Sequence, residues 1–170
     1  METAELRLAG VIRESIVDGP GWRFVVFTQG CPHHCEGCQN PQTHDFLGGY
    51  LSNTGNLLRE IKKDSLLAGV TFSGGEPFCQ AAPLALLARQ VHELGLNVMT
   101  YSGWTFEELY QERNKREGWQ ELLEETDILV DGKFVLAEKS LALKFRGSRN
   151  QRIIDVKTSM REGQTIMIDL

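Results

Sequence analysis

The sequence lacks three features, each of which would indicate a different class of protein. It has no run of about 18 apolar residues, the length that spans a membrane, so we expect no membrane as a partner. Residues 1–10 carry mixed charges and no apolar core, so no secretory signal is expected and the cytoplasm is the expected location. Lysine and arginine number 18 against 23 aspartates and glutamates, a net charge of −5, which disfavours a nucleic acid as partner.

Internal repeats, low-complexity segments and linkers are also absent. The 170 residues, of which 41% are hydrophobic, suffice for one core and predict a single domain over residues 1–170. Cysteine is scarce, and three of the four cysteines lie within eight positions. Because a disulfide framework would spread its cysteines along the chain, this clustering predicts a metal or redox site.

Short apolar runs alternate along the chain with segments of helical periodicity. The expected strands cover residues 23–29, 69–73, 97–101, 128–130 and 151–156. The expected helices are 54–67, a helix with Pro83 in its first turn and Gly95 at its end, a helix that the capping box of Thr105 and Glu108 opens, and 117–125. Leu84, Leu87, Val91 and Leu94 mark the apolar face of the second of these helices. This order predicts an α/β fold on a parallel sheet, either an open, partly wound barrel or a doubly wound sheet.

Two loops are expected to meet at one edge of this sheet. The cysteine loop follows the strand 23–29 directly, and Gly74-Gly75-Glu76 follows the strand 69–73. Ligands of such sheets bind at the carboxyl ends of the strands. The two loops are therefore predicted to share one site.

The cysteine loop has the spacing C-x3-C-x2-C, formed by Cys31, Cys35 and Cys38. Four thiolates would saturate a four-iron cluster, whereas three leave one iron open for a substrate. Two other interpretations compete with this one, a structural zinc site and inert thiols. The candidates for a fourth zinc ligand are Cys79, His33, His34 and His44. Cys79 is otherwise expected to be a small buried residue at a helix start.

The Gly74-Gly75-Glu76 loop has a functional and an ordinary interpretation. Two glycines allow backbone to approach a ligand closely, and the carboxylate beside them can accept a hydrogen bond from an ammonium group. An ordinary turn between a strand and a helix has the same composition. The pairing with the cysteine loop favours the functional interpretation.

Five segments together carry a more specific resemblance. C-x3-C-x2-C followed by SGGEP resembles the radical S-adenosylmethionine superfamily. The segments DGPGWR, CPHHCEGCQNPQT, YSGWTFEEL, ILVDGKF and KFRGSRNQRIIDV, taken in this order, resemble the activating enzymes of anaerobic (class III) ribonucleotide reductase. The likeness runs from about residue 12 to residue 156.

The resemblance implies a fold, two cofactors and a set of site residues. The fold is a partial (open) β/α barrel with a parallel sheet, and the cofactors are a 4Fe-4S cluster and S-adenosyl-L-methionine. The cluster ligands are Cys31, Cys35 and Cys38. The residues against the nucleoside are Gly37, Cys38 and Gln39, and those that hold the methionine amino group are Gly74, Gly75 and Glu76. Asp131 and Lys133 are implied near the methionine end. No catalytic residue is implied beyond the cluster and S-adenosylmethionine.

The implied activity is the reductive cleavage of S-adenosylmethionine to a 5′-deoxyadenosyl radical, which takes hydrogen from a glycine. That glycine lies on the large subunit of anaerobic ribonucleotide reductase, and the electron donor is a flavodoxin or a ferredoxin. The chain departs from related families at two positions. Gly37 stands where the wider superfamily often has an aromatic residue, and Thr100-Tyr101 stands where formate-lyase activases have an Asp-Thr pair linked to a cation.

Two rival functions remain at the level of sequence. One is a radical enzyme that acts on a small molecule, such as a deazapurine-forming synthase, and the other is a metal-binding or electron-transfer module without catalysis. Residues 133–157 hold seven basic residues against two acidic ones, which indicates either a docking face for the partner or a solvated surface.

Overall fold

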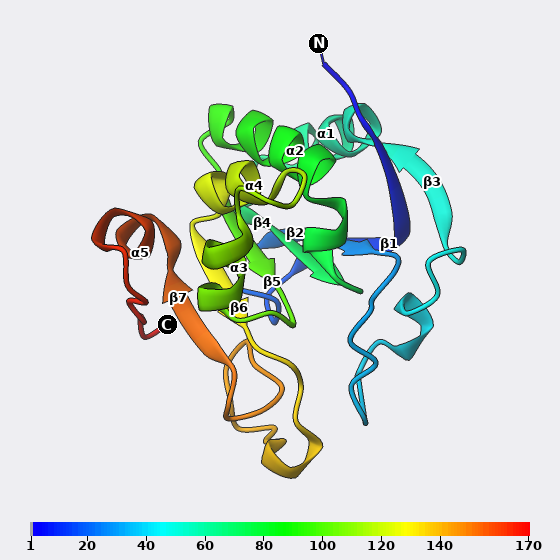
Figure 1. Ribbon diagram of the computed structural model, residues 1–170. Helices are drawn as coiled ribbons and strands as arrows, with labels where there is room; N and C mark the ends of the chain where they lie inside the picture. The colour runs from blue at the N-terminus through cyan, green and yellow to red at the C-terminus, as the bar shows by residue number, and fades with distance from the viewer. Residues whose placement is uncertain (1) are drawn as a thin grey trace.

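The computed structural model describes residues 2–170, which form one sheet of seven strands in the order β3-β1-β2-β4-β5-β6-β7 (Figure 1). The strands are β1 (Glu5–Ser15), β2 (Arg23–Thr28), β3 (Tyr50–Asn53), β4 (Gly69–Gly74), β5 (Asn97–Tyr101), β6 (Ile128–Asp131) and β7 (Arg152–Asp155). The neighbours β2, β4, β5 and β6 pair in parallel. The pairs β1–β2, β1–β3 and β6–β7 are antiparallel. The sheet is therefore open and mixed, and the prediction of a parallel sheet holds only for its central strands.

The strands at the two sides of the sheet explain this difference. Neither β1 nor β3 was predicted from the sequence. The four side chains of β3 are all exposed or half-buried, so this strand lacks the pattern of buried apolar residues that would indicate it. The connection from β6 to β7, residues 132–151, contains only a short 3-10 turn. A parallel neighbour requires a crossover that is usually an α-helix, and this connection has none, so β7 returns antiparallel to β6.

The helices contribute to the main core. They are α1 (Thr54–Lys62), α2 (Ala81–Glu93), α3 (Phe106–Glu112), α4 (Trp119–Glu125) and α5 (Val156–Glu162), with 3-10 turns at η1 (Pro41–Thr43), η2 (Pro77–Gln80) and η3 (Leu136–Glu138). Helices α1, α2 and α4 cover one face of the sheet (Figure 1). The predicted capping box of Thr105 and Glu108 is present at α3. Two details of the prediction are wrong. The helix predicted over 54–67 ends at Lys62, because Asp64 accepts a hydrogen bond from the amide of Leu66 and turns the chain. Leu94, which was predicted on the apolar face of α2, is 41% exposed.

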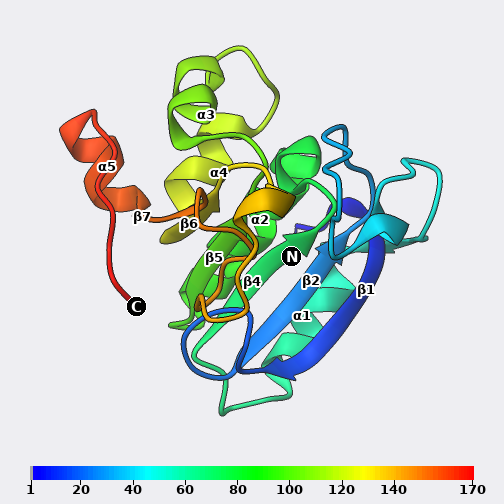
Figure 2. The ribbon, with the colours of Figure 1, turned by 90° about the horizontal axis from the view of Figure 1, so that it is seen from below.

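Alternation along the strands separates a core face from a second face. Phe24 and Val26 of β2 belong to the main core with the helices, whereas Phe27 points to the other side and lines a cavity. On that second face Met99, Val130 and neighbours form a smaller apolar cluster. Figure 2 shows the connection from β6 to β7 in front of β4 and β5, on the side away from α1. The second face is therefore enclosed by loops rather than by helices.

Arg23 fixes one end of the parallel strands from inside the protein. Its side chain is 1% exposed and donates to Thr71 Oγ1, at 2.7 Å, and to the carbonyls of Pro20 and Val70. It also donates to Asn97 Oδ1 at 2.7 Å. Burial lowers the pKa of Arg23 to about 10, so the guanidinium stays charged at neutral pH. This one side chain joins the loop before β2 to β4 and β5.

No helix within residues 2–170 has the length and apolar character that a membrane crossing requires.

Candidate functional site

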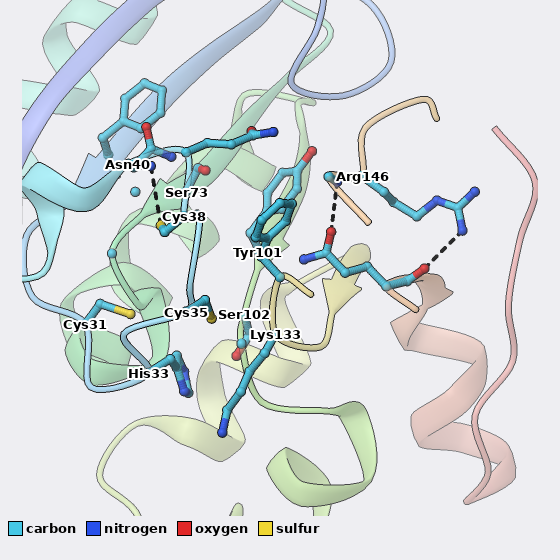
Figure 3. A pocket seen from close by; sticks show the side chains of 18 of the residues that line it. Cys31, His33, Cys35, Cys38, Asn40, Ser73, Tyr101, Ser102, Lys133 and Arg146 are labelled. Carbon is cyan, nitrogen blue, oxygen red and sulfur yellow. Dashed lines mark hydrogen bonds between the residues drawn. The ribbon is translucent and has the colours of Figure 1, made fainter. Parts of the chain in front are cut away.

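A cavity of about 500 Å³ lies on the second face, at the carboxyl ends of the parallel strands (Figure 3). Phe27 of β2, Ser73 of β4 and Tyr101 of β5 line it from the sheet. The cysteine loop and residues 132–151 contribute the remaining walls. The predicted meeting of the loops after β2 and β4 at one edge is therefore confirmed, because β2 and β4 are parallel neighbours.

Cys31, Cys35 and Cys38 all line this cavity. The loop that carries them begins at Gly30, whose φ of +106° suits glycine, and its backbone is tied to the turn at residues 43–44 by two hydrogen bonds. Burial raises the pKa of the Cys31 thiol, because it disfavours the charged thiolate. Cys79, in contrast, is exposed, and the prediction that it is buried was wrong. It sits in the 3-10 turn before α2, outside the cavity lining.

The arrangement of the thiols can be compared with the two kinds of metal site. Within residues 2–170, no three His, Cys, Asp or Glu side chains form a group that could hold a metal ion. Zinc requires its ligands to converge on one point. The thiolates of an iron–sulfur cluster instead bind different irons, so they can line a cavity without converging. Three thiols on the wall of one 500 Å³ cavity therefore fit a 4Fe-4S cluster.

Glu76 joins three loops beneath the cavity. Its carboxylate is fully buried, and Oε1 lies 2.7 Å from His33 Nε2 in the cysteine loop. The same oxygen accepts from Ser102 Oγ at 2.9 Å and from the amide of Gly103 at 2.7 Å, both in the loop after β5. Oε2 accepts from the amide of Phe78. Gly74 and Gly75 line the cavity, whereas Glu76 does not, so its contact with a ligand ammonium group stays a prediction.

The two glycines allow the loop after β4 to pack against the loop after β2. Gly74 has a φ of +96°, and a Cβ there would lie 2.5 Å from the Thr28 amide nitrogen. A Cβ on Gly75 would lie 2.4 Å from the Gly30 carbonyl oxygen. Backbone hydrogen bonds from Gly75 to Thr28 and from Glu76 to Gly30 close this contact. A side chain at either glycine would push the two loops apart.

We expect the Gly74→Ala variant to lose about 2 kcal/mol more unfolding free energy than Gly95→Ala, and to retain less iron. Both glycines have positive φ, so both substitutions introduce backbone strain, but a Cβ on Gly95 meets nothing within 4 Å. Urea unfolding of the two variants measures the difference, and iron analysis after reconstitution measures its consequence for the site. Equal losses in both variants would show that the close approach has no energetic role.

The remaining predicted residues occupy different depths. Gln39 and Lys133 line the cavity, and Lys133 is exposed. Gly37 packs against the loop after β6, because a Cβ there would lie 2.8 Å from Leu136 Cδ1. Asp131 is 1% exposed and does not line the cavity.

Asp131 is instead held by protein donors. Its carboxylate accepts from the amide of Phe106 at 2.7 Å and from Arg152 Nε at 3.0 Å. Arg152 also binds Glu107, and this hydrogen-bonded pair lowers the pKa of Glu107 to about 2. The role that the resemblance implies for Asp131 near the methionine end stays a prediction.

Sequence reasoning assigned no role to several lining residues. Tyr101 lines the cavity, and its hydroxyl donates to the carbonyl of Phe145 at 2.6 Å, while burial raises its pKa. Thr100, the preceding residue, points the other way and hydrogen-bonds to Thr126. Gln151 also lines the cavity, in the segment KFRGSRNQ that carries part of the resemblance, and so does Arg146, which was placed from the sequence in the basic stretch 133–157.

Comparison with known proteins gives four results. A family model described as "4Fe-4S single cluster domain" matches residues 17–154. The anaerobic ribonucleoside-triphosphate reductase-activating protein of Vibrio cholerae is 34% identical over 146 residues, which cover 81% of this chain and 90% of that protein. The protein of the same name from Enterobacteria phage T4 is 34% identical over 145 residues, which cover 81% and 86%. The crystal structure of QueE from Escherichia coli aligns with a TM-score of 0.49 and 18% identity over 59% of this chain and 54% of QueE.

Proposed function

Because the chain belongs to the family of anaerobic ribonucleotide reductase-activating proteins, which are radical S-adenosylmethionine enzymes, we propose that it generates the glycyl radical of an anaerobic ribonucleotide reductase. The observation that carries the proposal is the set of three thiols that share one cavity with the Gly74-Gly75 loop at the ends of parallel strands. This chemistry requires an iron with an open coordination position next to a backbone segment that a ligand can approach closely.

When bound and reduced, the 4Fe-4S cluster would supply the electron that splits S-adenosylmethionine into methionine and a 5′-deoxyadenosyl radical, which then takes a hydrogen atom from a glycine of the large reductase subunit. The protein's own part is to position the groups and to exclude water. Cys31, Cys35 and Cys38 would hold the cluster. An external flavodoxin or ferredoxin would provide the electron.

The residues around the cavity would hold S-adenosylmethionine in one orientation. Gly37, Cys38 and Gln39 would lie along the nucleoside, and Gly74 and Gly75 would present backbone to the methionine amino group. Lys133, an exposed cation on the lining, is suited to pair with the methionine carboxylate.

Two buried carboxylates would support this arrangement from below. Glu76 would fix the relative positions of the cysteine loop and the loop after β5. Its carboxylate would accept a hydrogen bond from the methionine amino group if that group replaced one of the present donors. Asp131 would fix the end of β6 next to Lys133. We also propose that the open sheet, with helices on one face and the cavity on the other, corresponds to the partial β/α barrel of the superfamily.

Anaerobic reconstitution with iron and sulfide tests the proposal. The reconstituted, reduced protein should form 5′-deoxyadenosine from S-adenosylmethionine, and a mixture with an anaerobic ribonucleotide reductase should show a glycine-centred doublet by low-temperature electron paramagnetic resonance. A colourless, zinc-loaded protein would indicate a binding module instead. Formation of 5′-deoxyadenosine without a glycine doublet would indicate a small-molecule substrate.

A further inference from the structure

A second cleft, of about 470 Å³, lies between the β6–β7 connection and the last residues of the chain. The cations on its walls are Lys144, Arg146, Arg149 and Arg152. Asp169 is the acidic side chain among its lining residues, and Ile153 and Met167 add apolar surface. We call this the basic cleft. It is notable in a chain whose net charge is −5.

Most of the cationic charge in the basic cleft is not neutralised within the protein. Arg152 is paired with Asp131 and Glu107. Among residues 2–170, in contrast, Lys144, Arg146 and Arg149 have no carboxylate within 4.0 Å, although Asp169 lines the same cleft. The Nε atom of Arg146 is buried and has no hydrogen-bond partner among the described residues. The cleft therefore presents cations that an external anionic group can pair with.

The basic cleft adjoins the site cavity. Leu143, Arg146 and Gln151 line both spaces. Figure 3 shows Arg146 at the side of the site cavity, where its Nη1 donates to the carbonyl of Gln151. A chain segment that enters the site cavity can therefore continue into the basic cleft.

The wall that carries these cations is held in place by the protein. Tyr101 binds the Phe145 carbonyl, and Gln151 Oε1 accepts from the amides of Gly147 and Ser148. Because the backbone is fixed before any ligand arrives, less ordering entropy is lost on binding. The basic cleft is thus a preorganised surface for a partner.

We propose that the basic cleft binds an acidic segment of the protein substrate, next to the residue that enters the site cavity. This inference rests on the proposed function and adds to it the chemistry of the docking segment. Carboxylate side chains pair with the free cations, while aliphatic side chains of the same segment pack on Ile153 and Met167. The apolar surface and the negative net charge of the chain favour a peptide over a nucleic acid.

The double variant Lys144→Glu/Arg149→Glu tests this docking. Both side chains are exposed, and neither lines the site cavity. With the reconstituted holoenzyme, the KM for the reductase should rise at least tenfold, while kcat and the cleavage of S-adenosylmethionine without reductase stay at the parent's values. Added salt should raise the parent's KM and lower that of the charge-reversal variant, because salt screens the attraction in the parent and the repulsion in the variant.

The matched control is Arg59→Glu/Lys62→Glu, which makes the same change in net charge on two exposed residues of α1. The control should keep the parent's KM, and the neutral variant Lys144→Gln/Arg149→Gln should give an intermediate KM. An equal rise in the control would mean that only net charge matters and would overturn the proposal.

An unchanged KM in the charge-reversal variant would also overturn the proposal. If that variant had in addition lost binding of a single-stranded oligonucleotide, the cleft would be assigned to nucleic acid. If the parent itself gives no glycine radical with the reductase, the proposed function fails, and this result is distinct from an unchanged KM.

Discussion

Replacement of any one of Cys31, Cys35 or Cys38 by serine should abolish the brown colour of the reconstituted protein and lower its activity more than about 100-fold. The loss of residues that only support metal ligands already costs ~10- to 100-fold in metal affinity or activity, so the loss of a ligand itself should exceed that range. The three thiols line one cavity, and the structure places no fourth cysteine there to replace them.

The matched control for these variants is Cys79→Ser. Cys79 is exposed and lies outside the cavity lining, so its variant should keep the iron content and the activity of the parent. Iron and sulfide analysis, visible absorbance and the rate of 5′-deoxyadenosine formation are the measurements. A cluster that survived the loss of Cys35, or one that Cys79→Ser removed, would require a different ligand set.

Replacement of Arg23 by alanine should lower the free energy of unfolding by about 3–5 kcal/mol, the largest loss of stability that we expect from a single substitution. The variant would leave Thr71 Oγ1, Asn97 Oδ1 and the carbonyls of Pro20 and Val70 without the donor that they share. It would also leave a cavity between the loop before β2 and the two strands that Arg23 joins.

Urea unfolding of the variant and of Arg13→Ala measures this loss. Arg13 is 70% exposed and has one ion pair, with Glu60, so its replacement should cost less than about 1 kcal/mol. If Arg23→Ala does not fold, Arg23→Lys provides the test: it keeps the charge, loses the planar fork of donors and should show a smaller loss than alanine. A loss below 1 kcal/mol in Arg23→Lys and Arg23→Ala alike would mean that burial of this guanidinium contributes little.

Elements with a strong local signal were predicted well from the sequence. The start of α2 at Ala81 agrees with Pro83 in its first turn, and α3 begins at the predicted capping box. The largely buried strands β4 and β5 differ from the predicted ranges by one residue at most. In each case the signal lies within a few neighbouring residues, so it does not depend on the rest of the fold.

Elements that depend on distant partners were missed or misplaced. β3 has no buried side chain, and it is a strand only because β1 offers hydrogen bonds at that edge. The antiparallel direction of β7 follows from the course of residues 132–151, which has no regular period. The exposure of Cys79 depends on how η2 meets α2, and its composition alone suggested a buried residue.

The sequence by itself determined that three thiols lie together, because cysteines within eight residues stay close in any fold, and their number predicts a cluster with one open iron. Only the tertiary structure decided what surrounds them. Glu76 meets His33 and Ser102, which are 43 and 26 residues away, and the cations of the basic cleft face residues from the end of the chain. Such contacts are made by strand order and loop packing, which bring together residues that no local pattern connects.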